Sequence, residues 1–269
     1  MSKITLLPDR GVLAVRGPDR VSFLNGLVSN DAALAAPGRA VWAALLTPQG
    51  KYLADFFMFA GEDALLLDTQ KTAIPALLTK LTRYRLRAAV TLVDASDQYA
   101  VYAGWDGPPP PSPLAAPDPR LTEAGWRALC PAPLTANATA DDYAAHRIVL
   151  GLPDGPPDLE PEKTLLLEAG FDELHGIDWK KGCYMGQELT ARTKYRGLVK
   201  RRLVPVDIAQ PGAAPGTPIL ADQREVGELR SVAGGLGLAM LRQDALDKNL
   251  TAGDAPLSCR PPAWMHLPG

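Results

Sequence analysis

One segment of the chain, residues 176–206, differs from the rest in charge and composition. It reads GIDWKKGCYMGQELTARTKYRGLVKRRLVPV, and between Lys180 and Arg202 it holds eight Lys or Arg residues against a single acid, Glu188. It constrains the fold because it predicts a tight loop, a helix and a basic strand in direct succession. The whole chain has a net charge of −2, so a site for an anionic ligand or partner must be local.

Cys183 lies inside the string KGCYMGQE of this segment, between Gly182 and Gly186. The two glycines permit positive φ and leave backbone N–H groups uncovered, which suits a loop that approaches a ligand. Good helix formers predict a helix over residues 187–193, and its dipole would stabilise a thiolate at Cys183. Such a thiolate serves as a nucleophile or as a soft metal ligand. The alternative, which the residues alone leave open, is a small buried cysteine beside a solvated row of lysines.

The three cysteines, at positions 130, 183 and 259, lie far apart and form no CxxC pair. They therefore predict neither a disulfide framework nor a metal site that one chain completes alone. The three histidines are scattered and show no ligand spacing. If Cys183 holds a metal cluster, the other ligands must come from a partner or a small molecule.

Elsewhere, short apolar runs alternate with turn residues and helical periods. Residues 41–60 predict two strands joined by a turn, and residues 71–84 predict an amphipathic helix. Seven prolines in residues 104–120 predict an exposed loop without regular structure. Near the end, short strands broken by Pro and Gly predict a small antiparallel barrel and then an irregular tail; the strands are expected at residues 199–208, 218–220, 225–232 and 237–241.

KGCYMGQE, followed by LTART and the basic run KRRLVPV, resembles the signature of the YgfZ-type relatives of the glycine-cleavage T-protein, an aminomethyltransferase. Within that family the chain is most similar to the iron–sulfur cluster assembly factor branch of mitochondria and many bacteria. The resemblance implies an α+β, T-protein-like folate-binding fold of antiparallel sheets with packed helices over residues 1–198. It implies a small C-terminal β-barrel over residues 199–269.

The resemblance also implies a set of site residues. Cys183 would supply one thiolate to an iron–sulfur cluster, expected to be 2Fe–2S, that is shared with an A-type scaffold protein. Lys180, Lys181 and Arg192 would lower the pKa of the thiol and offset the charge of the cluster. No residue is assigned as catalytic beyond this functional thiol, and the residues expected at the cofactor are Lys181, Gly182, Cys183, Tyr184, Gly186, Gln187, Glu188, Arg192 and Asp55.

Asp55 lies in the apolar run KYLADFFMFA, where an acid is either an edge residue that faces water or a buried group with a partner. The residues alone favour the edge, because an unpaired buried acid is costly; the resemblance instead predicts a central cavity. T-proteins carry two consecutive acids here, and this chain has Ala54. Val149 stands where a T-protein glutamate grips the pterin of tetrahydrofolate, and Glu162 or Glu168 is the candidate substitute.

These departures favour a non-catalytic assembly factor, with tetrahydrofolate binding as an open possibility and enzymatic activity unsettled. The first alternative is a folate-dependent one-carbon transferase that uses Asp55, with Lys181 or Arg192 on the glutamate tail. The second is an RNA-binding or tRNA-modification accessory protein that uses residues 194–202. A nucleic-acid partner is not expected on a slightly acidic chain. The sequence shows no signal-peptide core and no apolar run of about 18 residues, which predicts a cytoplasmic protein without a membrane segment.

Overall fold

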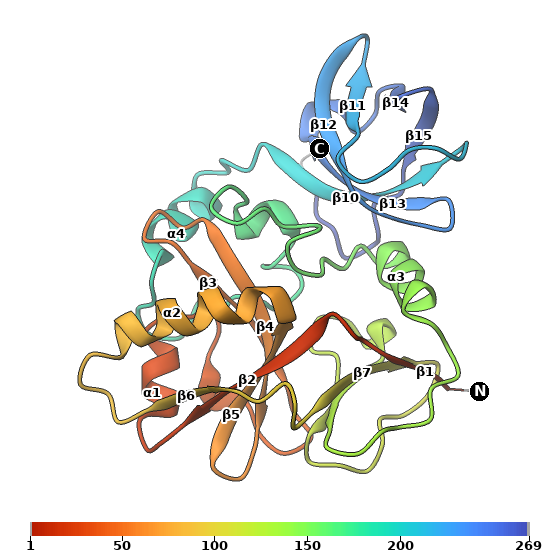
Figure 1. Cartoon of the computed structure of the whole chain (residues 1–269). Coiled ribbons are helices and arrows are strands. Elements are labelled where there is room, and N and C mark those ends of the chain that lie inside the picture. The colour runs from red at the N-terminus through yellow and green to blue at the C-terminus, as the bar shows by residue number, and fades with distance from the viewer. Residues whose placement is uncertain (1, 268–269) are drawn as a thin grey trace.

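The computed structural model describes residues 2–267 and contains two antiparallel sheets, helices and a closed barrel (Figure 1). The five-stranded sheet has the order β3-β4-β5-β2-β6. Both of its faces are covered, which explains the near-continuous apolar runs in its strands. Its strands are β2 (Arg10–Arg16), β3 (Val41–Leu46), β4 (Tyr52–Ala60), β5 (Ala64–Gln70) and β6 (Thr91–Asp94).

Two helices cover one face of this sheet, α1 (Arg20–Asn25) and α2 (Ile74–Arg85). The helix expected at residues 71–84 is confirmed, with a 3-10 turn at Lys71–Ala73 and Pro75 in the first turn of α2. Pro is tolerated there because the first N–H groups of a helix have no partner within it. No helix within residues 2–267 has the length and apolar character needed to span a membrane.

The four-stranded sheet, in the order β1-β7-β9-β8, shares a core with the other face of the five-stranded sheet. One of its strands, β8, lies inside the proline-rich segment that we expected to be loop throughout, so this prediction is wrong at Ala115–Pro117. An edge strand tolerates proline because one row of its N–H groups needs no ladder partner. The elements here are β1 (Lys3–Leu6), β7 (Ala100–Trp105), β8, β9 (Trp126–Cys130) and the nearby α3 (Ala140–Val149).

The C-terminal strands close into a six-stranded barrel, in the order β10-β13-β12-β11-β14-β15 (Figure 1, blue). The fold class predicted from the sequence is confirmed. The last two strands lie in the tail that we expected to be irregular, so that prediction is wrong there. Both strands are short, and the hairpin between them turns at Gly253, which has a positive φ. The division into domains 1–198 and 199–269 stays a proposal. The strands are β10 (Arg201–Ile208), β11 (Pro218–Ala221), β12 (Arg224–Ala233), β13 (Leu236–Arg242), β14 (Leu250–Ala252) and β15 (Ala255–Cys259).

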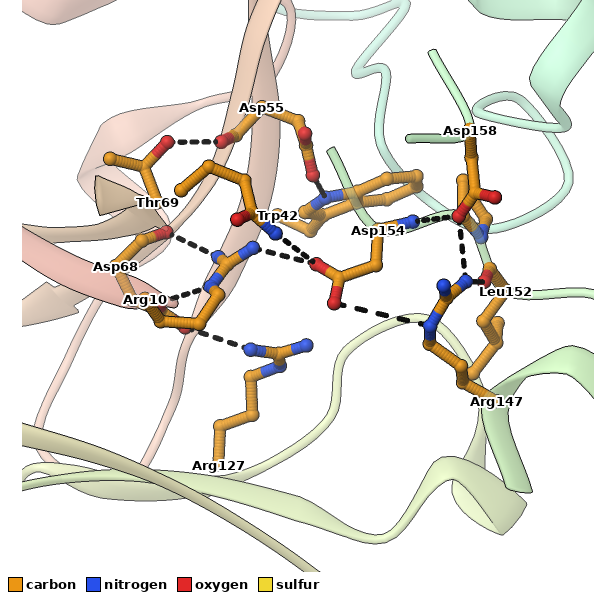
Figure 2. A network of polar contacts seen from close by, with 12 residues as sticks. Arg10, Trp42, Asp55, Asp68, Thr69, Arg127, Arg147, Leu152, Asp154 and Asp158 are labelled. Atoms are coloured by element: carbon orange, nitrogen blue, oxygen red, sulfur yellow. Dashed lines mark hydrogen bonds and ion pairs between the residues drawn. The ribbon is translucent and has the colours of Figure 1, made fainter. Parts of the chain in front are cut away.

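A buried network of ion pairs ties these parts together (Figure 2). Asp68, on β5, binds the Nε of Arg10 at 2.6 Å and the Nη1 of Arg127 at 3.0 Å. Arg10 also binds Asp154 at 2.7 Å. Because the partners come from β2, β5, β9 and the segment after α3, the network joins both sheets.

The network continues into the barrel. Arg147, on α3, binds one carboxylate oxygen of Asp158 at 2.6 Å, and the other oxygen accepts from the hydroxyl of Ser231 at 2.5 Å. Ser231 lies on β12, and Arg147 also donates to its hydroxyl at 3.1 Å. Polar contacts therefore fix the barrel to the body through α3.

The network predicts a loss of stability in acid. Burial alone would raise the pKa of Asp154, but the guanidinium groups of Arg10 and Arg147 outweigh it and hold that pKa well below its usual range. A carboxyl group with a lowered pKa stabilises the fold above its unfolded pKa of about 4 and loses that contribution as the pH falls through its folded pKa. Urea unfolding at a series of pH values should show this fall, and Asp154→Asn should make it shallower. If the free energy of unfolding of Asp154→Asn fell with decreasing pH as steeply as that of the wild type, the prediction would be contradicted.

Candidate functional site

The predicted site residues from Lys181 to Glu188 form the loop before α4 (Gln187–Tyr195) and the first turn of that helix. The predicted helix at this place is confirmed. Cys183 is exposed, whereas Cys130 is buried and Cys259 is half-buried. The interpretation of Cys183 as a small buried apolar residue is therefore wrong. We call residues 178–186 the signature loop.

The first end of the signature loop is held by Lys181. Its Nζ donates to three backbone carbonyls, those of Asn25 at 2.9 Å, Val28 at 2.7 Å and Asn30 at 3.1 Å. Burial lowers the pKa of Lys181 to about 8. The amine thus binds one carbonyl at the C-terminal end of α1, that of Asn25, and two in the segment that follows the helix. This contact fixes the backbone two residues before Cys183.

The second end of the loop is held by Tyr184, whose side chain is buried. The backbone N–H of Tyr184 donates to Oε1 of Gln187 at 3.2 Å, and the N–H of Gln187 donates to the carbonyl of Tyr184 at 3.2 Å. Burial raises the pKa of Tyr184 to about 12, and its hydroxyl has no hydrogen-bond partner within the described residues. Anchors on both sides leave the side chain of Cys183 in solvent.

Asp178 is a site residue that the sequence did not indicate. Its Oδ1 accepts from the N–H of Lys180 at 2.7 Å and from the N–H of Lys181 at 3.3 Å. An aspartate that bonds the backbone two residues later is a known turn device, so the DWKKG string held a signal for this turn. The carbonyls that receive Lys181 lie more than 150 residues earlier in the chain, and no local signal announces them.

The two glycines of the loop have different roles. Gly186 has φ +81°, and a Cβ there would lie 2.6 Å from the carbonyl oxygen of Thr47 and 3.0 Å from Cα of Gly50. Gly182 does not have a positive φ, and a Cβ there would meet nothing within 4 Å. The positive φ that the sequence permits at both glycines is therefore adopted only at Gly186.

This difference yields a matched pair of substitutions. Gly186→Ala should lower the free energy of unfolding by about 2–4 kcal/mol, because the left-handed conformation and the contact with Thr47 both oppose a Cβ. Gly182→Ala should change it by less than about 0.5 kcal/mol. Denaturant titrations of the two variants measure both values. Equal effects would show that the turn after Leu46 does not constrain the loop.

α4 begins without a side-chain cap, and its N-cap is Gly186. The N–H of Gln187 donates to the carbonyl of Tyr184, and no side chain within residues 2–267 caps the N–H groups that follow; the helix dipole favours negative charge at this end. Glu188 and Arg192, which we expected at the site, are both exposed on α4. Their predicted roles beside the thiolate stay predictions.

Asp55 lies apart from the signature loop, on β4, an interior strand of the five-stranded sheet. The edge interpretation is wrong, because Asp55 is 2% exposed. One carboxylate oxygen accepts from Tyr52 Oη at 2.8 Å. The other accepts from Trp42 Nε1 at 3.0 Å (Figure 2). Tyr52 and Trp42 are themselves buried, so the cost of burying this acid is offset by hydrogen bonds.

These contacts bear on tetrahydrofolate, which the T-protein resemblance implies. Trp42 stacks on Phe171 with ring centroids 3.8 Å apart, and the guanidinium of Arg120 lies 5.3 Å from the Trp42 ring. Both oxygens of Asp55 thus have protein partners, and the neighbouring indole is packed against Phe171 and Arg120. The residues around Asp55 do not fit a pterin in this arrangement, and folate binding stays a prediction.

The other positions considered for the pterin offer no replacement carboxylate in the core. Glu168 is buried, but it accepts from Arg201 at 3.0 Å and from the N–H of Leu165 at 3.1 Å. Glu162 is exposed, and Val149 lies 46% exposed at the end of α3. Within residues 2–267, no group of three or more His, Cys, Asp or Glu side chains is arranged to hold a metal ion. A cluster bound at Cys183 would need ligands from outside these residues.

Comparisons with known proteins show which proteins share this fold and this barrel. Residues 200–267 match the family described as the CAF17 C-terminal beta-barrel domain. The fold is shared with the glycine cleavage system aminomethyltransferase T from Bartonella henselae, with a TM-score of 0.74 over 99% of this chain and 87% of that one, at 14% identity. The fold and the barrel together define the class, a T-protein-like body with a CAF17-type barrel.

Similarity in sequence identifies the family. The mitochondrial iron–sulfur cluster assembly factor IBA57 of Homo sapiens is 34% identical to this chain, over 87% of this chain and 76% of its own length. That of Mus musculus is 33% identical, over 89% of this chain and 77% of its own length. The homologue from Mycosarcoma maydis is 37% identical over 81% of this chain, which spans 60% of that protein. The chain belongs to the family of IBA57-type iron–sulfur cluster assembly factors.

One prediction from the sequence is corrected by these relatives. We expected a cytoplasmic protein, but the relatives are named mitochondrial, which contradicts that expectation. The physical argument behind the prediction was the lack of a secretory signal core. That observation concerns secretion alone and does not distinguish the other compartments.

Proposed function

We propose that this chain acts in iron–sulfur cluster assembly by supplying the thiolate of Cys183 as one ligand of a cluster shared with a scaffold protein. The observation that carries the proposal is the exposure of Cys183 between two anchored ends of the signature loop. The family, whose members are named iron–sulfur cluster assembly factors, supports the same role. The KGCYMGQE string further supports membership of the YgfZ-type group.

The chemistry of the site suits a shared cluster, which is the cargo of the reaction. The thiol loses its proton when its sulfur binds iron, and the uncapped start of α4 favours the resulting negative charge. Iron–sulfur clusters are held mainly by cysteine thiolates, so a single exposed cysteine leaves the remaining positions to the partner. We take the cluster to be 2Fe–2S and the partner to be an A-type scaffold.

Anaerobic reconstitution tests the proposal. The protein is mixed with an A-type scaffold, iron and sulfide, and the products are followed by visible absorption and size-exclusion chromatography. A coloured complex that contains both proteins is expected for the wild type and not for Cys183→Ser. An unchanged coloured complex in the variant would refute the role of Cys183 as a ligand.

The alternatives have less support. Folate-dependent one-carbon transfer would need Asp55 to release Tyr52 or Trp42, and a tetrahydrofolate titration with fluorescence detection of bound ligand examines this directly. The RNA-binding alternative would need the basic residues 194–202 as a group, yet Lys194, Arg201 and Arg202 each pair with an acid of the chain. Neither alternative requires an exposed Cys183.

A further inference from the structure

The eight cations of the basic segment fall into two sets in the folded chain. Four are committed to internal partners. Lys181 binds three carbonyls, Lys194 pairs with Asp172 at 2.9 Å, Arg201 with Glu168 at 3.0 Å and Arg202 with Glu173 at 2.7 Å. The other four are exposed and form no ion pair within residues 2–267; they are Lys180, Arg192, Arg196 and Lys200.

The helical periodicity of α4 gathers free cations on one side. Thr190 is buried and Lys194 lies 4.2 Å from the ring of Trp179, so these two residues mark the side that faces the body. At about 100° per residue, Arg192 and Arg196 point to the opposite side. Leu189 lies at the edge of that side, because a Cβ on Gly50 would be only 3.1 Å from its own Cβ. Glu188, the single acid of α4, is also exposed and lies on this same side, one turn before Arg192.

Apolar side chains are interleaved with these cations. Leu189 is 38% exposed, Tyr195 75% and Leu198 45%, and the N–H of Leu198 donates to Thr193 O at 3.0 Å, which holds it against the last turn of α4. Three of the eight exposed large apolar side chains in residues 2–267 thus fall within ten consecutive residues. We define the α4 face as Leu189, Arg192, Tyr195, Arg196 and Leu198.

We infer that the α4 face is a docking surface for an acidic protein surface with an apolar centre, carried by the scaffold that completes the cluster. This inference rests on the proposed function. Tyr and Arg are enriched at the energetic centres of protein interfaces, and unpaired cations select partners of opposite charge. Because α4 starts four residues after Cys183, a partner seated on this face has its own ligands close to the thiol.

The same features favour a protein over a nucleic acid. A surface that follows a phosphate backbone presents cations in a row, with aromatic rings that stack on bases. On the α4 face the cations alternate with Leu189 and Leu198, which offer neither charge nor a flat ring. The chain as a whole carries a net charge of −2, which opposes a polyanion at longer range.

The test measures binding of the metal-free A-type scaffold, so that no cluster takes part. The variant Arg192→Glu with Arg196→Glu should weaken the affinity at least about tenfold. The matched control, Arg224→Glu with Lys248→Glu, reverses two exposed cations on the barrel and should stay within about twofold of the wild type. Wild-type affinity should fall between about 0.05 M and about 0.5 M salt, and the α4 variant should lose this dependence.

Additional variants and measurements distinguish the docking surface from the cluster ligand and from a nucleic-acid site. Tyr195→Ala should weaken binding without changing the salt dependence, and thermal unfolding should confirm that every variant is folded. Cys183→Ser should bind the metal-free scaffold normally and yet form no coloured complex. Equal affinities for the α4 variant, the barrel control and the wild type would overturn the inference while leaving the role of Cys183 intact. Binding of a single-stranded oligonucleotide that is lost in the α4 variant, with scaffold binding unchanged, would also overturn it.

Discussion

Replacing Asp68 by Asn is expected to lower the free energy of unfolding by about 3–5 kcal/mol. Asp68 is fully buried and binds two guanidinium groups, those of Arg10 at 2.6 Å and Arg127 at 3.0 Å (Figure 2). Asparagine has nearly the same shape but no charge, so both buried cations lose their shared counter-charge. Removing one partner of a buried pair costs far more than the pair contributes, because the remaining charge stays out of water.

Asp63→Asn is the matched control for this prediction. Asp63 also pairs with an arginine, Arg16, but its side chain is 69% exposed. Water screens such a pair, so the same substitution should cost less than about 1 kcal/mol. Chemical denaturation of the two variants and the wild type at neutral pH gives both differences. A cost below about 1 kcal/mol at Asp68 would mean that the network does not stabilise the fold.

Cys183→Ser is expected to abolish the shared iron–sulfur complex, with little effect on stability. The side chain of Cys183 is exposed, so exchange of sulfur for oxygen should change the free energy of unfolding by less than about 0.5 kcal/mol. A hydroxyl is a poor ligand for iron in a cluster held by thiolates. The cluster content of the complex, measured as iron per complex after chromatography, should fall to the level of the scaffold alone.

The two other cysteines make this experiment specific. Burial raises the pKa of Cys130 above its usual range and that of Cys259 to about 11, so neither thiol readily forms the thiolate that binds metal. Cys130→Ser and Cys259→Ser should therefore retain the cluster. A loss of cluster in either variant, without unfolding, would move the ligand away from the signature loop.

Several parts of the fold were predictable from the sequence because their signals are local. The apolar spacing over residues 71–84 marks α2, and helix formers after Gly186 mark α4. Four barrel strands were readable from runs bounded by Pro and Gly. β14 and β15 were not, because strands this short carry too few alternations to stand out and are stabilised by closing the barrel.

The local sequence was enough to place Cys183 in a glycine-containing loop before a helix, within a cationic segment. The partners of those charges depend on how distant segments pack. Packing turns Lys181 inward to carbonyls of a distant segment, pairs three more cations with acids, and leaves Arg192 and Arg196 exposed. It also buries Asp55, against the local expectation, because Tyr52 and Trp42 supply the hydrogen bonds that offset desolvation. Those partners are set by packing between separate elements, and no local pattern encodes them.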